Sequence, residues 1–112
     1  MSGWEYMTVE WDRGGILIVP GEGIDIDCLS EMFPSARIKK DTLASRVLPS
    51  VPTCLKVDKL ASVDGFAALA ILQHLGARGW EAVRITGDFV DFGMLCSGTG
   101  MAWLKRPLRE KP

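Results

Sequence analysis

The sequence predicts an α+β domain in which an antiparallel sheet of about four to five strands carries one main helix on one face. Three observations lead to this prediction. Strand-like segments rich in aromatic and β-branched residues lie in both halves of the chain, one long segment has helical apolar spacing, and glycine or proline turns separate these segments. At 112 residues, the chain has the length of one domain rather than two.

The first two strands are predicted to form a hairpin. Residues 4–11 are rich in aromatic and β-branched types, which favour a strand. Gly14 and Gly15 follow as a turn, and residues 16–19 form a second short strand that Pro20 and Gly21 end. This hairpin is expected to open the sheet.

Residues 20–59 are predicted to be an insertion between two parts of the core, residues 3–19 and 60–107. Within the insertion, Asp25–Phe33 is expected to form a short helix with Asp25 or Asp27 as its N-cap, and Pro34 limits its end. Residues 34–58 combine prolines with scattered apolar residues, a composition that favours extended segments. Residues 108–112 are expected to be a frayed tail.

The main helix is predicted over about residues 63–75. Apolar residues recur there at spacings of three and four, which places them on one face that we expect to pack against the sheet. These residues are Val63, Phe66, Leu69 with Ala70, and Leu72 with Ile71. Gly76 is expected to end the helix. The following segments 80–86, 89–96 and 101–106 are strand-like and are separated by short turns, so we expect an antiparallel meander.

Two blocks of the chain match a more specific pattern. Trp4-Glu5-Tyr6 opens the first strand, and residues 75–83 read LGARGWEAV, while the last strand ends in Lys105-Arg106-Pro107. The chain thereby resembles a family of small bacterial proteins known as domain of unknown function forty-one seventy-seven, whose members combine W-E-Y, a helix ending L-G-x-x-G-W-E-x-V, and a hairpin ending K-R-P. The resemblance covers about half of the chain. It implies a compact β-α-β-β core and no assigned activity, and residues 20–59 exceed the usual length of the family.

The charge of the chain argues against general nucleic-acid binding. The formal net charge is −1, whereas phosphate contacts need a basic surface. Acidic residues dominate positions 1–34 and basic residues dominate positions 35–112. Either the fold brings these halves together and their fields cancel, which we favour, or an acidic patch meets a basic patch on a second copy.

The cysteines and the first residues favour a cytoplasmic protein. Cys28, Cys54 and Cys96 are odd in number and widely scattered, which fits reduced thiols better than a disulfide framework or a zinc site. The first residues lack the basic segment and apolar run of a signal peptide. No apolar stretch approaches the roughly 18 residues that suggest a membrane span. We therefore predict no membrane partner, no metal and no cofactor.

Several predicted strands are apolar on both faces, more than one helix can cover. A helix of about 13 residues is near 20 Å long and shields one side of a sheet. The other side then needs a cover, either residues 20–59 or a second copy of the chain. The leading hypothesis is a non-catalytic domain that forms a homodimer or tetramer through its sheet face or edge. The predicted interface or core anchors are Trp4, Trp11, Phe92 and Trp103.

A rival hypothesis is a small-molecule-binding domain or small enzyme with an apolar pocket between the sheet and residues 20–59. Its chemistry would use His74, the only histidine, with an acid such as Asp88 or Asp91. The position of His74 near a helix C-terminus, where the helix dipole favours a cation, also explains this residue without catalysis. A third hypothesis is a protein-binding accessory module that presents an exposed aromatic patch on a stable monomer.

Overall fold

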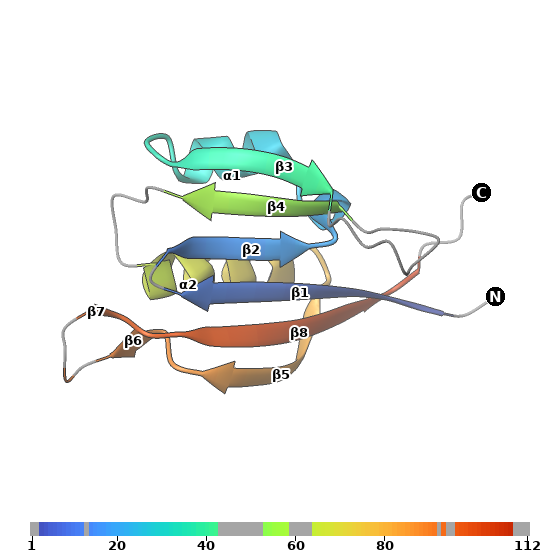
Figure 1. The fold of residues 1–112 in the computed structure, drawn as a ribbon. Coiled ribbons are helices and arrows are strands. Elements are labelled where there is room, and N and C mark those ends of the chain that lie inside the picture. Colours follow the sequence, from blue (N-terminus) through green and yellow to red (C-terminus); the bar gives the residue numbers. More distant parts are fainter. Residues whose placement is uncertain are drawn as a thin grey trace.

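The computed structural model describes residues 3–12, 14–42, 53–58, 64–91, 93 and 96–108. These residues form a six-stranded antiparallel sheet, a separate two-stranded hairpin and two α-helices (Figure 1). The sheet strands are β1 (Trp4–Asp12), β2 (Gly15–Val19), β3 (Arg37–Thr42), β4 (Thr53–Asp58), β5 (Glu81–Gly87) and β8 (Gly100–Pro107), and the hairpin strands are β6 (Val90–Asp91) and β7 (Cys96–Ser97). The helices are α1 (Ile26–Met32) and α2 (Asp64–Gly76), and a 3₁₀ turn, η1, spans Gly21–Gly23. The strand order is β3-β4-β2-β1-β8-β5.

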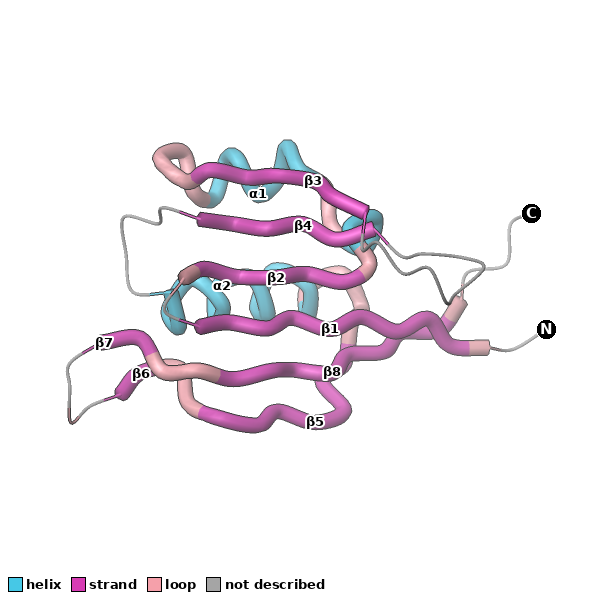
Figure 2. The backbone as a smooth tube through the Cα atoms, in the orientation of Figure 1, coloured by secondary structure: helices cyan, strands magenta, loops and turns pink. Residues whose placement is uncertain are grey.

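The predicted α+β class with an antiparallel sheet is confirmed, but the predicted four to five strands and single main helix are not. The sheet has six strands and a second helix, α1, accompanies α2. Both additions come from residues 20–59. Strands β3 and β4 extend the sheet beside β2, and α1 lies on the same side of the sheet as α2 (Figure 2). The described part of this segment therefore widens the sheet, and both described α-helices lie on one side of it.

The β1–β2 hairpin is confirmed, and its register sets the two faces of the sheet. Trp11 pairs with Ile16 and Val9 pairs with Ile18, and all four side chains are buried on the helix side. Because successive side chains in a strand point to opposite faces, Trp4 and the alternate residues after it project to the other side. The helix-side residues of β1, β2, β4 and β8 join α1, α2 and Trp80 in one core cluster.

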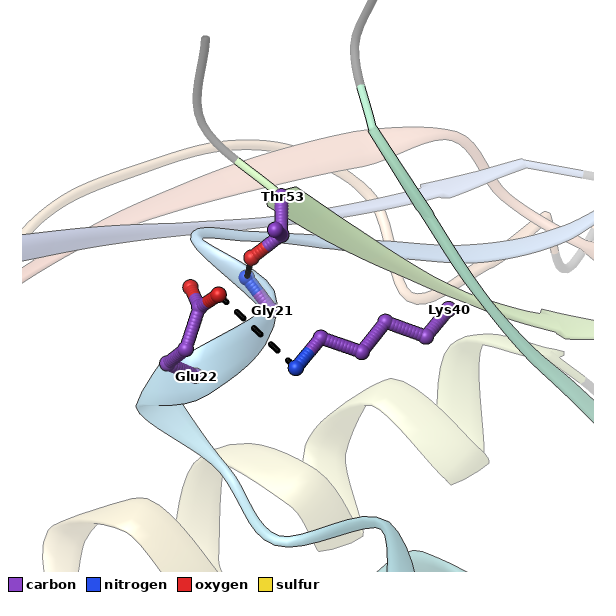
Figure 3. A network of polar contacts seen from close by, with 4 residues as sticks. All are labelled: Gly21, Glu22, Lys40 and Thr53. Atoms are coloured by element: carbon purple, nitrogen blue, oxygen red, sulfur yellow. Dashed lines mark hydrogen bonds and ion pairs between the residues drawn. The ribbon is translucent and has the colours of Figure 1, made fainter. Parts of the chain in front are cut away.

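Helix α1 begins as predicted, with Asp25 as its N-cap. The Asp25 carboxylate accepts a hydrogen bond from the backbone N–H of Asp27 at 3.0 Å. Just before it, the Gly21 N–H donates to Thr53 Oγ1 at 3.2 Å, and Glu22 forms an ion pair with Lys40 at 3.7 Å (Figure 3). These contacts fasten the turn η1 to β4 and β3, and so help to hold the inserted strands on the sheet.

Helix α2 has the predicted extent, but among the described residues of the predicted apolar face only Ile71 and Leu72 pack into or against the core. Phe66 is 55% exposed and Leu69 is 38% exposed. The buried positions are Ala67, Ala68, Ile71 and Leu75. Small alanines allow the helix backbone to approach the sheet closely, because the sheet supplies the large side chains of the core. The helix ends at Gly76 as predicted, and the positive φ of the connection to β5 lies at Gly79, +91°.

The predicted meander is wrong in its middle strand. Strand β5 pairs directly with β8, and the residues between them leave the sheet to form the short β6–β7 hairpin (Figure 1). Trp11 accounts for this departure, because its ring stacks on Phe89 with centroids 4.7 Å apart and its Nε1–H donates to the Asp88 carbonyl at 2.8 Å. The start of the hairpin is thus held against the core.

Candidate functional site

The side of the sheet opposite the two helices is the most distinctive described surface, and we call it the open face. Three aromatic side chains project from it, Trp4 and Tyr6 of β1 and Trp103 of β8, with exposed fractions of 47%, 65% and 37%. The register places Thr8 directly opposite Trp103 and Tyr6 directly opposite Lys105, so the three rings lie on neighbouring strands. Large exposed aromatics gathered in this way mark an interaction surface.

Cations lie over two of these rings. Lys105 Nζ is 4.2 Å from the centroid of the Trp4 ring. The Arg84 guanidinium of β5 is 6.0 Å from the centroid of Trp103, its cross-strand neighbour. Such cation–π contacts hold flexible side chains against the rings. One end of the open face therefore combines aromatic rings with cations.

At the other end of β1, the open face carries two acidic residues. Glu10 and Asp12 follow the aromatic residues along β1, and they border a groove of about 280 Å³ with Leu17, Lys56 and Asp58. Among the described residues, no group of three or more histidine, cysteine, aspartate or glutamate side chains is placed to hold a metal ion. We therefore assign no metal site to this groove.

Charges of both signs are balanced over the whole open face. The strand registers place five basic and five acidic residues there, namely Arg37, Lys39, Lys56, Arg84 and Lys105 with Glu10, Asp12, Asp41, Asp58 and Glu81. A surface that binds nucleic-acid phosphates has an excess of bases. The described open face has no such excess.

The predicted anchors separate into two groups. Trp4 and Trp103 lie on the open face, whereas Trp11 points to the opposite side and is 1% exposed in the core. The side chain of Phe92 lies outside the described residues. Arg84 and Lys105 were not among the predicted site residues, because only the pairing of β8 with both β1 and β5 brings these cations beside the aromatic rings.

The predicted pocket residues do not form one cluster. His74 lies in the last turn of α2, while Asp88 precedes Phe89, whose carbonyl closely approaches Gly65 in the first turn. Nine residues of helix separate these two ends, a distance of about 14 Å at 1.5 Å per residue. The side chain of Asp91 lies outside the described residues. Between the sheet and α1, where the rival hypothesis places an apolar pocket, lie the buried side chains of Ile24, Leu29 and Leu55.

The pKa of His74 gives a testable property of this helix end. Partial burial, and then the Arg78 guanidinium, hold its pKa below the ordinary value of 6.5, and Arg78 lies 3.1 Å from His74 Nδ1. The unfolded chain therefore binds a proton more readily than the folded chain, so stability is complete above pH 6.5 and declines as the pH falls below it. We expect a shallow fall in the urea midpoint between about pH 7.5 and about pH 5.5.

The matched variant for this prediction is His74→Gln, which removes the titrating group. Its urea midpoint should change less than that of the wild-type protein over the same pH interval. An equal decline in both proteins would assign the effect to other groups.

Comparison with protein-family models, with curated proteins and with solved structures found no match to this chain. The geometry of the chain itself therefore provides the basis for a function. In the part of the chain that the structure describes, no helix has the length and apolar character needed to cross a bilayer.

Proposed function

We propose that this protein is a non-catalytic domain that binds a second copy of itself through the open face. The observation that carries the proposal is the cluster of Trp4, Tyr6 and Trp103 on the side of the sheet that carries neither helix. Burial of apolar surface stabilises an association by about 25 cal/mol per Å², and aromatic residues dominate such contacts. The free thiols of Cys28 and Cys54 support the further proposal that the protein works in the reducing cytoplasm.

The edges of the sheet support a contact through the face rather than through an edge. At one edge, β3 carries Arg37, Lys39, Lys40 and Asp41, and such charged edge strands resist pairing with another sheet. At the other edge, β5 has a register shift between Ala82 and Arg84, which is a β-bulge at Val83. A bulge twists an edge strand and interrupts its hydrogen-bonding pattern. Both edges therefore have features that discourage strand addition.

The charges of the open face favour a two-fold arrangement. Along β1 and β8, the aromatic residues and Lys105 lie on one side of Thr8, and Glu10 and Asp12 lie on the other side. A two-fold axis that crosses β1 near Thr8 lays two open faces together with their strands antiparallel. Lys105 of each copy then lies diagonally across from Glu10 of the other, one strand away, and the two Trp103 side chains meet near the axis. Two packed sheets normally cross at about 30°, which this arrangement can accommodate.

Trp103→Glu is the variant that tests the proposal. A buried, unpaired carboxylate in place of an aromatic ring should raise the dimer dissociation constant about a hundredfold or more. Analytical ultracentrifugation over a range of concentrations measures the effect. Ile26→Glu is the matched control, because Ile26 is a partly exposed residue of α1 on the helix side and its substitution should leave the dimer intact.

A charge exchange tests the two-fold arrangement. Lys105→Glu and Glu10→Lys should each weaken the dimer, and the double variant should recover much of the lost affinity. A wild-type protein with the mass of one chain at high micromolar concentration would refute self-association. If Trp103→Glu leaves the dimer dissociation constant unchanged, the open face is not the contact surface.

A further inference from the structure

Helix α2 is apolar on the side that points away from the sheet as well as on the side that packs against it. Its sheet side buries Ala67, Ala68, Ile71 and Leu75. On the opposite side, Phe66 and Leu69 are 55% and 38% exposed, and Gln73 is the polar residue among the described positions. A helix that is apolar all round is normally covered all round. Among the described residues, those that bury α2 lie on its sheet side.

We propose that α2 packs against α2 of a second copy in an antiparallel two-fold pair, and that this contact is separate from the open face. The shape of the exposed side fits such a pair. The large side chain of Phe66 lies in the first turn, whereas the small residues Gly76 and Ala77 lie at the other end and are exposed. A two-fold axis between Leu69 and Gln73 lays each Phe66 over the small residues of the other copy. Small contact residues allow helices to approach to about 8 Å.

The charges at the two ends of α2 select the antiparallel arrangement. Asp88 is exposed beside the first turn, where it borders a groove of about 390 Å³ together with Phe66 and Leu69. Arg78 is exposed just after the last turn. In the antiparallel pair, Asp88 of each copy lies near Arg78 of the other, and the opposite ends of the two helix dipoles are adjacent. A parallel pair would instead bring like charges together.

The size of this apolar patch sets its strength relative to the open face. On α2, Phe66 and Leu69 are the two large exposed apolar side chains. A stable interface is much larger, because each partner contributes roughly 20–30 residues to it. The α2 contact is therefore the weaker one. Because α2 lies on the side of the sheet opposite the open face, the two α2 helices of an open-face dimer face in opposite directions, so the contact joins dimers into tetramers and larger assemblies as the concentration rises. These assemblies rest on the proposed open-face dimer, whereas the α2 contact itself does not.

Sedimentation equilibrium over a wide concentration range tests the α2 contact. The wild-type protein should pass from dimers to tetramers and larger assemblies as the concentration rises, and Phe66→Glu should not associate beyond a dimer. Asp88→Arg and Arg78→Glu should each weaken the association of dimers about tenfold or more, and the double variant should restore it. Glu31→Arg is the matched control, because it reverses an exposed acid on α1 without touching α2. Circular dichroism establishes that each variant is folded.

The outcomes separate this contact from the open-face dimer. If Phe66→Glu has the same concentration dependence as the wild-type protein, the α2 contact is refuted. If the charge-exchanged double variant is no better than the single variants, the antiparallel arrangement is refuted. If Trp103→Glu still forms dimers while Phe66→Glu is a monomer, the α2 contact stands and the open-face proposal fails.

Discussion

Replacing Trp11 by alanine should lower the free energy of unfolding by about 3–5 kcal/mol, the range for removing a large aromatic side chain from a core. Trp11 is 1% exposed, stacks on Phe89 and donates a hydrogen bond to the Asp88 carbonyl. Its ring also lies so close to Gly100 of β8 that a side chain at Gly100 would collide with it. Trp11 therefore joins three parts of the chain. Urea unfolding followed by circular dichroism measures the loss.

Trp4→Ala is the matched control for this prediction. Trp4 lies on the same strand and is also a tryptophan, but it is 47% exposed on the open face. Measured at concentrations low enough to give a monomer, its substitution should cost less than about 1 kcal/mol, as is usual for surface positions. An equal loss at both positions would contradict the assignment of Trp11 to the core and Trp4 to the open face.

Gly65→Ala should destabilise the protein by roughly 3 kcal/mol or more, although alanine is the better helix former. A Cβ atom at Gly65 would overlap the backbone carbonyl of Phe89, and this backbone cannot move away without disturbing the stack of Phe89 on Trp11. Glycine is thus required where the first turn of α2 meets the residues that follow β5. Thermal and urea unfolding measure the effect.

Gly76→Ala provides the contrasting substitution in the same helix. Nothing lies within 4 Å of a Cβ atom placed there, and the backbone has no positive φ that would disfavour alanine. This substitution should therefore be neutral or slightly stabilising. If Gly65→Ala were as harmless as Gly76→Ala, the close packing of α2 against Phe89 would be wrong.

The candidate site was only partly accessible from the sequence. Alternation along residues 4–11 places Trp4 and Trp11 on opposite faces of one strand, and this holds in the structure. The pattern does not state which face the helices cover, because both faces carry large apolar side chains. Only the packing of α2 on Met7, Val9 and Trp11 makes Trp4 an open-face residue.

The sequence by itself determined the local elements. Apolar spacing, capping residues and turn residues located α1, α2 and the β1–β2 hairpin, because each depends on residues a few positions apart. The tertiary structure alone decided the strand order, the inclusion of β3 and β4, and the separation of β6 and β7 from the main sheet. These features depend on pairing between distant segments, such as β8 with β1 across most of the chain. Local patterns carry no information about which of several compatible strands will pair. The packing of the whole core selects among them.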